Sequence, residues 1–341
     1  MKNLKNSLLI ALWFMFLTFP ILVIKVNTLD NVVEWRWANL IYVGLGAFAL
    51  SFLWRRMLKR KRALSKLAEQ GQLDGLNQSF SARLMEDPKL YRPAMALGLA
   101  ACVVFPLIFS TYQTNILISA LIYVVLGLGL NITVGLAGLL DLGYVAFFAV
   151  GAYSYPLLYE HFGVTFWLAL PIGAALGALF GLLLGFPILR LRGDYLAIVT
   201  LGFGSIVKIV LENWGDFTHG PSGIANIPRP GFFGMEMDLT QATTYVYYIM
   251  IVLVLITILV TNRLKDSRIG RAWIALREDE IACVAMGIDM AKTKLSAYAL
   301  GAAWAGLVGV IFAAKTTFIN PASFTFMESA IILSIVVLGG M

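Results

Sequence analysis

Charged residues are scarce in this chain of 341 residues: Asp, Glu, Lys and Arg make up 13% of it, against 60% hydrophobic residues. Soluble globular proteins carry about 25% charged residues, because polar groups must cover their surface. The composition therefore excludes a soluble enzyme. Disorder is excluded by the 22 Phe, 13 Tyr and 8 Trp. Unbroken apolar runs exclude an outer-membrane barrel, whose strands alternate apolar and polar residues.

Residue types that build chemical sites are also few. The two cysteines cannot form a disulfide framework, so we expect Cys102 and Cys283 to be free thiols. The two histidines, His161 and His219, lie in separate segments without a second ligand at metal spacing, so no metal site is predicted. The sequence has no G-x-x-x-x-G-K-[ST] loop for binding a nucleotide. We therefore predict no cofactor in this chain, and any ATP must be hydrolysed by a partner.

What the chain does have is long apolar segments. A bilayer core of about 30 Å requires about 20 apolar residues in a helix. Ten segments qualify, which predicts an all-α polytopic membrane protein in contact with membrane lipid. Their approximate bounds are 7–26, 38–54, 94–111, 116–134, 143–158, 165–189, 196–211, 243–260, 295–314 and 326–341.

The net charge of +7 could indicate a nucleic-acid partner, but in a polytopic chain the distribution of positive residues reports topology. If ten helices alternate across the membrane from a cytoplasmic N-terminus, the inner loops hold 21 of the 26 Lys and Arg residues. This satisfies the positive-inside rule. We therefore predict that the N-terminus is cytoplasmic and that no nucleic acid binds.

Small residues recur every fourth position in two of the predicted spans. They are Gly173, Gly177, Gly181, Gly185, Gly301, Ala305 and Gly309. Such stripes let a neighbouring helix backbone approach closely. We interpret them as helix packing surfaces rather than as a solute site.

Residues 127–143 are unusual for a membrane helix, because five glycines, an Asn and an Asp interrupt the apolar run. Broken helices at membrane depth are tolerated where they line a cavity, and their free ends can bind a polar solute. The alternative is an ordinary inner loop with Asp141 in solvent. Candidates for the translocation pathway are Gly127, Asn131, Gly135, Gly138, Asp141, Tyr144, Gly202 and Gly204. Lys208 lies near the outer end of its span, and we expect it to reach the interface without a transport role.

The predicted inner loop 261–294 contains a helical pattern over residues 270–287. Apolar residues at helical spacing are expected to fit a groove on a partner, and Gly287 is expected to end the helix. These apolar residues are Trp273, Ile274, Ile281 and Ala285. A solvated connector is the alternative, and periodicity does not choose between the two.

Four runs, at residues 127–151, 185–204, 219–224 and 270–283, closely resemble the permeases of bacterial branched-chain amino acid ABC transporters of the LivM type. The resemblance implies an importer with a second, LivH-like permease, two cytoplasmic ATPases that bind ATP and Mg, and a periplasmic amino-acid-binding protein. It also implies the bacterial cytoplasmic (inner) membrane, and a coupling helix around Glu280 that docks in an ATPase groove. Coupling candidates are Arg277, Glu278, Asp279, Glu280, Ala282 and Gly287. Four residues separate Ala282 from Gly287, one more than in the general importer pattern.

The resemblance divides the chain in two. Residues 1–92 are expected to form two transmembrane helices and a basic cytoplasmic loop, and residues 93–341 the permease core with the coupling loop at 261–294. Members of the family continue through further spans, so we expect the core to be incomplete. The expected solutes are Leu, Ile and Val, with urea or short amides as the alternative. A self-sufficient secondary transporter would carry paired ionisable groups in its spans, where only Lys208 is predicted to lie.

Overall fold

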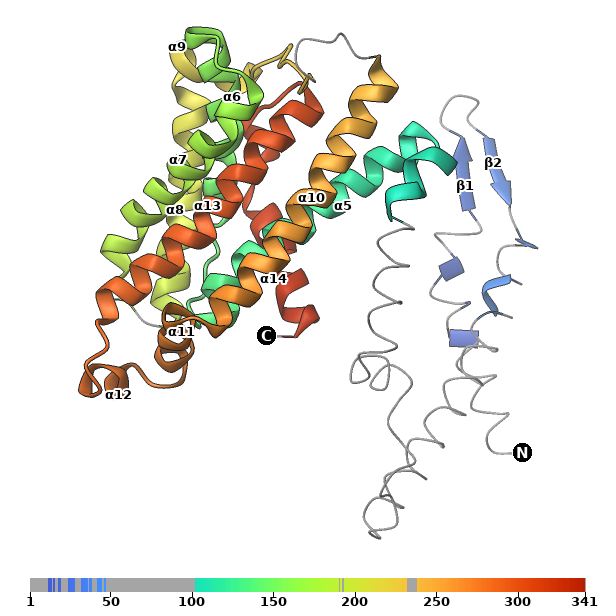
Figure 1. Ribbon diagram of the computed structural model, residues 1–341. Coiled ribbons are helices and arrows are strands. Elements are labelled where there is room, and N and C mark those ends of the chain that lie inside the picture. Colours follow the sequence, from blue (N-terminus) through green and yellow to red (C-terminus); the bar gives the residue numbers. More distant parts are fainter. Residues whose placement is uncertain are drawn as a thin grey trace, which may run out of the picture. The chain divides into compact units, whose positions relative to one another are not determined.

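The structure is a computed structural model that divides into two units, Met1–Leu97 and Gly98–Met341, each considered by itself (Figure 1). It describes short stretches between residues 12 and 46, and then residues 102–340 except 190, 192 and 232–237. The predicted loop 55–92 and most of the first three predicted spans lie outside the described residues.

The first unit contains an antiparallel pair of strands, β1 (Ile24–Asn27) and β2 (Val32–Trp35). Ile24 pairs with Trp35, and Asn27 pairs with Val32. The prediction that the first helix continues to residue 26 is therefore wrong. The β-branched residues here favour a pleated strand, which an apolar count over a long window does not detect.

The second unit is helical, and every span predicted after residue 111 corresponds to a helix. The longer helices are α5 (Thr111–Asn131), α6 (Val145–Phe162), α7 (Phe166–Ile188), α8 (Asp194–Asn213), α10 (Leu239–Asp266), α11 (Arg268–Glu278), α13 (Met290–Thr316) and α14 (Phe326–Gly339). The shorter ones are a π-helical turn (Ile132–Leu136), α9 (Gly215–Thr218), α12 (Glu280–Ala285) and 3-10 turns at Gly220–Ser222 and Pro321–Ser323. Residues 102–108 are also helical, and Ser110 begins α5 with a capping box, so the third predicted span ends early.

Within the described part of the chain, six helical segments are long and apolar enough to cross a membrane. They are Thr111–Leu136, Phe166–Ile188, Tyr195–Asn213, Leu239–Asp266, Met290–Thr316 and Pro321–Gly339. The helical polytopic class is confirmed, whereas the predicted number of ten crossings is not.

The small-residue stripe of α7 packs against α13, which lies in the middle of the bundle (Figure 1), whereas the glycines of the α13 stripe face α5 and α6. A side chain at Gly181 would meet the backbone of Tyr298 at 2.7 Å, and one at Gly177 would meet the carbonyl of Ala302. The interpretation of these stripes as packing surfaces is confirmed, because no side chain fits between the two backbones.

Two non-helical segments interrupt the bundle. The first break (residues 137–144) follows α5 and leads into α6, and the second break (residues 317–325) follows α13 and leads into α14. The two helix starts meet, because the backbone N–H of Val145 donates to the hydroxyl of Ser329 at 3.0 Å. This junction positions the candidate site.

Candidate functional site

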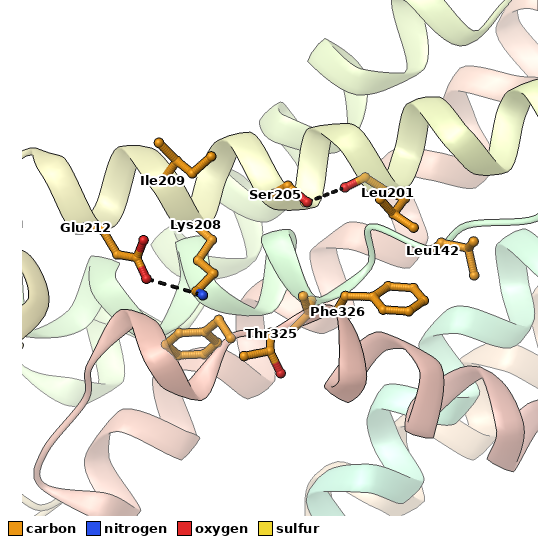
Figure 2. Close-up of a pocket in the computed structure, with 11 residues that line it drawn as sticks. Leu142, Leu201, Ser205, Lys208, Ile209, Glu212, Thr325 and Phe326 are labelled. Atoms are coloured by element: carbon orange, nitrogen blue, oxygen red, sulfur yellow. Dashed lines mark hydrogen bonds and ion pairs between the residues drawn. The ribbon is translucent and has the colours of Figure 1, made fainter.

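A cavity of about 280 Å³ lies between α8 and the two breaks (Figure 2). Its apolar lining consists of Leu142, Val145, Leu201, Ile209, Phe324 and Phe326, and Gly204 leaves part of its wall bare. Its polar lining consists of Ser205, Lys208, Glu212 and Thr325. The cavity therefore combines an apolar wall with a small number of polar groups, which is the usual character of a small-molecule site.

Two opposite charges face this cavity from α8. The Lys208 ammonium lies 3.3 Å from Glu212 Oε1, and the two side chains are 33% and 34% exposed. Figure 2 shows both side chains extending from α8 toward Thr325 on the second break. Lys208 is thus paired and lines a cavity, and its expected position at the membrane interface stays a prediction. Glu212 belongs to the last turn of α8.

The first break is sealed by buried polar contacts. Asp141 is fully buried, and its Oδ1 accepts the backbone N–H of Gly143 at 2.9 Å. The N–H of Leu142 donates to the hydroxyl of Thr200 on α8 at 3.0 Å. A side chain at Gly143 would collide with the carbonyl of Thr200. The alternative of a loop with Asp141 in solvent is therefore wrong.

At one end of the bundle, the predicted single helix over residues 270–287 is two helices, α11 and α12 (Figure 1). The chain turns at Asp279, whose Oδ1 accepts the N–H groups of Ile281 at 2.7 Å and Ala282 at 3.0 Å. This is an N-cap, which aspartate favours and which begins a new helix. Gly287 has a φ of +81° just after α12, so its predicted role as a helix stop is confirmed.

Three contacts hold this helix pair to the bundle. Trp273 is fully buried, and its indole N–H donates to the carbonyl of Thr293 at 3.1 Å. Arg277 donates to the carbonyl of Gly135 at 2.7 Å. The Lys294 ammonium, whose side chain is 1% exposed, lies 2.7 Å from Glu280 Oε1. Trp273 is therefore not available to a partner groove as predicted, and Glu280 faces the bundle.

The start of α13 beside this ion pair is capped by a charged aspartate. Asp289 accepts the backbone N–H of Lys292 at 3.1 Å, and its carboxylate lies 3.1 Å from the ammonium of the same lysine. These interactions, led by the backbone hydrogen bond, hold the pKa of Asp289 below its ordinary value. The cap is thus ionised at neutral pH, and the negative charge stabilises the helix start.

Comparison with known proteins connects these features to a family. The family described as the permease component of the branched-chain amino acid transport system matches residues 112–341. This chain belongs to that family. Over 263 residues the permease is 47% identical to the high-affinity branched-chain amino acid transport system permease protein LivM of Escherichia coli K12. The aligned region covers 71% of this chain and 62% of the LivM chain.

Two further relatives support the assignment. The LivM protein of Salmonella typhimurium LT2 is 47% identical over 267 residues, covering 72% of this chain and 63% of its own. A probable branched-chain amino acid transport permease protein LivH of Methanocaldococcus jannaschii is 28% identical over 207 residues, covering 58% of this chain and 65% of its own. The permease thus spans less than two thirds of the length of the two LivM proteins. No solved structure matches it.

Of the predicted pathway residues of the permease, Gly204 lines the cavity, beside Gly143 of the first break. Tyr144 is buried next to the cavity and donates to the carbonyl of Gly301 at 3.0 Å. Gly202 faces open space on α8. The remaining candidates lie outside the cavity wall: Gly127 faces α14, Asn131 fills the space next to Gly135, and Gly138 packs against Arg277.

Two groups of predicted residues therefore meet, since Arg277 of the coupling candidates contacts both Gly135 and Gly138 of the pathway candidates. Glu212 and Glu328 were missed by the sequence reasoning. Glu328 lies in the first turn of α14 and accepts the hydroxyl of Tyr123 at 2.7 Å. An acid two residues inside an apolar segment was the signal that could have identified it.

The helix α12 exposes apolar side chains. Ile281, Val284 and Met286 are 72%, 53% and 81% exposed, and we call them the α12 apolar face. Ala282 and Ala285 are exposed beside them. Of the coupling candidates, Arg277, Glu278 and Asp279 are exposed at the turn between the helices.

The two cysteines do not line the cavity. Cys102 is exposed and Cys283 is buried, and both are free, as predicted. Across the described residues, no group of three or more His, Cys, Asp or Glu side chains is arranged to hold a metal ion.

Proposed function

We propose that the chain is the transmembrane permease subunit of an ATP-driven importer for branched-chain amino acids. The observation that carries this proposal is the α11–α12 pair, which is held to the bundle by buried contacts while the α12 apolar face is left exposed. A rigid element with a bare apolar face is what a partner that drives a conformational change requires. The relatives are named as permeases of branched-chain amino acid transport, which supports the solute class.

The partners follow from this assignment. The permease pairs with a second, LivH-like permease and with two cytoplasmic ATPases that dock on α12, bind ATP and Mg, and hydrolyse the nucleotide. A periplasmic amino-acid-binding protein delivers solute to the opposite end of the bundle. The chain itself is not an enzyme. It lies in the bacterial inner membrane with its N-terminus and α12 in the cytoplasm, as the placement of 21 of its 26 Lys and Arg residues in the inner loops supports.

The α11–α12 contacts indicate how ATPase closure moves the permease. Displacement of α12 pulls on the buried Lys294 of α13 through Glu280. Displacement of α11 pulls on the carbonyl of Gly135 through Arg277. Gly135 lies in the π-helical turn that leads into the first break. Removing one partner of a buried ion pair is costly, so α12 and α13 move together rather than separate. Movement at the ATPase is thus delivered to the cavity wall.

Uptake and assembly test this proposal together. Cells lacking the chain should lose uptake of radiolabelled L-leucine, and the tagged chain should co-purify with nucleotide-binding ATPases. Ile281→Ser on the α12 apolar face should weaken this co-purification about tenfold, the size expected for loss of a buried anchor at an interface. The matched control is Ile269→Ser, because Ile269 is also exposed, at 47%, but lies at the far end of α11.

Two results would contradict the proposal. Leucine uptake that is independent of the chain, combined with uptake of urea or acetamide that depends on it, would move the solute class to urea and short amides. Chain-dependent uptake that persists without any co-purifying ATPase would instead indicate a secondary transporter.

A further inference from the structure

We propose that the cavity between α8 and the two breaks is a binding site for a free amino acid with an apolar side chain, held at its two charged groups by Lys208 and Glu212. This inference rests on the proposed function and deepens it, because it assigns the solute a place inside the permease.

The charge pattern of the cavity matches a zwitterion. Lys208 and Glu212 are one helical turn apart on α8, and their charged atoms lie 3.3 Å apart at the cavity wall. An α-amino acid carries one carboxylate and one ammonium on the same carbon, so both charges can be matched at once. A ligand with a single charge would use the free bonding positions of only one of the two residues, and would gain only one charge-assisted hydrogen bond.

The two residues have free bonding capacity although they contact each other. An ammonium has three N–H donors, and a carboxylate has about four acceptor positions. The contact between the two side chains joins the Lys208 ammonium to one carboxylate oxygen of Glu212, Oε1. Each side chain is about a third exposed, so the ligand carboxylate can reach Lys208 and the ligand ammonium can reach Glu212 without rupture of the pair.

The start of α14 adds a second element that favours the ligand carboxylate. Thr325 and Phe326 line the cavity where this helix begins. Within the described residues, the side chain of Thr325 makes no hydrogen bond that caps the helix. The first N–H groups of a helix carry partial positive charge and attract an anion. Figure 2 shows Thr325 on the side of the cavity that Lys208 faces.

The remaining wall fits an apolar side chain. Leu142, Val145, Ile209 and Phe324 provide branched and aromatic surface around a volume of about 280 Å³. Burial of apolar area would contribute to the affinity, at about 25 cal/mol per Å². Urea and short amides carry neither the charges nor the apolar group that this lining would satisfy.

A ligand in the cavity would contact both breaks of the bundle. Leu142 and Val145 belong to the segment that continues from the first break, which Arg277 ties to α11, whereas Phe324 and Phe326 belong to the second break and α14. A ligand that touches both would stabilise whichever arrangement of the two breaks fits it better. Solute binding and the state of the coupling helices would thereby be linked.

The test uses photolabelling of the full chain in native membranes with L-photo-leucine, a diazirine analogue of leucine that keeps both charges. Cross-linked peptides are mapped by mass spectrometry. We expect cross-links in residues 201–212 and 324–326, with protection by excess L-leucine. Leucinamide lacks the carboxylate and 4-methylpentanoate lacks the ammonium, so neither should protect.

The variants give an independent reading. Lys208→Gln and Glu212→Gln should each lower labelling about tenfold, the effect of losing one charge-assisted hydrogen bond. Glu160→Gln is the matched control, because the side chain of Glu160 is also partly exposed, at 47%, and lies 3.4 Å from His219, but outside the cavity. Labelling of the control should equal that of the wild type. The positions of the cross-links in the wild-type protein are measured without any variant, so they do not depend on whether a variant folds.

The outcomes separate this inference from the proposed function. Chain-dependent leucine uptake with cross-links elsewhere, or with equal protection by 4-methylpentanoate, overturns the site and leaves the importer standing. Leucine uptake that does not depend on the chain overturns both. Protected cross-links at the expected peptides in a chain that supports uptake establish the site.

Discussion

The two breaks in the bundle are sealed in different ways. The first break uses side chains: Asp141 accepts the N–H of Gly143, and Thr200 accepts the N–H of Leu142. The second break is joined to a neighbouring segment, residues 223–228, through its backbone: Ile319 and Ile224 exchange hydrogen bonds of 3.0 Å and 2.9 Å. Both solutions satisfy backbone groups that a helix would otherwise pair, as burial requires.

The two breaks are also bonded to different parts of the bundle. The first break is attached to α11 through Arg277, at the end of the bundle that holds α12. The second break is attached to the segment at residues 223–228, which follows α9 at the other end (Figure 1). The two meet where Val145 donates to Ser329, next to the cavity. The cavity therefore adjoins two segments that are bonded to opposite ends of the bundle.

The largest expected effect comes from the ion pair under α12. Glu280→Gln leaves the buried Lys294 without its counter-charge and should cost about 3–5 kcal/mol in local stability. Hydrogen exchange should then rise in residues 137–144 and stay unchanged in residues 317–325. The double variant Glu280→Gln/Lys294→Met removes both charges and should recover most of the protection. An equal rise in both breaks would contradict their separate attachment.

The next effect concerns the contact between the first break and α8. Gly143→Val would place a side chain against the carbonyl of Thr200, which cannot move aside without moving the helix. Overpacking of this kind should cost about 3 kcal/mol, measured as a lower free energy of unfolding in detergent. Gly202→Val is the control, since nothing lies within 4 Å of its added carbon. Equal losses in the two variants would show that α8 tolerates no bulk at all, rather than a specific contact.

A smaller effect is expected for Arg277. Arg277→Gln weakens the 2.7 Å contact with the carbonyl of Gly135 while leaving α12 in place. Loss of one charge-assisted hydrogen bond should reduce leucine-stimulated ATP hydrolysis by the assembled importer about tenfold. Arg271→Gln serves as the control, because Arg271 is an exposed arginine of the same helix that donates instead to the carbonyl of Asp266, at 2.7 Å. Unchanged stimulation in Arg277→Gln would mean that α11 does not act on the first break.

The smallest effect is expected in the second break. Asn320 caps the turn Pro321–Ser323, and its Oδ1 accepts the N–H of Ser323 at 3.2 Å and its hydroxyl at 2.7 Å. Asn320→Ala should lower the free energy of unfolding by about 1 kcal/mol, as for loss of a helix cap. Ser323→Ala retains the backbone bond and should cost less. A loss in Asn320→Ala as large as in Gly143→Val would erase the distinction between the breaks.

Sequence reasoning identified most of this architecture, but not the contacts within it. Each apolar segment after residue 111 is a helix, because a bilayer core requires that length and hydropathy. Residues 24–26 were assigned to a helix and form a strand, since local β-branched residues outweighed the apolar count. Trp273 has helical spacing suited to a partner groove, yet it packs inside its own chain. Spacing gives the face of a helix but not what covers that face.

By itself, the sequence determined the membrane class, the family and the presence of helical structure in the segment that carries the coupling candidates. These depend on composition and on runs of adjacent residues, which are properties of the chain before it folds. Only the tertiary structure decided that Lys208 pairs with Glu212 in a cavity, that Glu280 holds Lys294, and that Arg277 binds the carbonyl of Gly135. The last contact joins residues 142 positions apart, and no local pattern specifies which distant groups a folded chain brings within bonding distance.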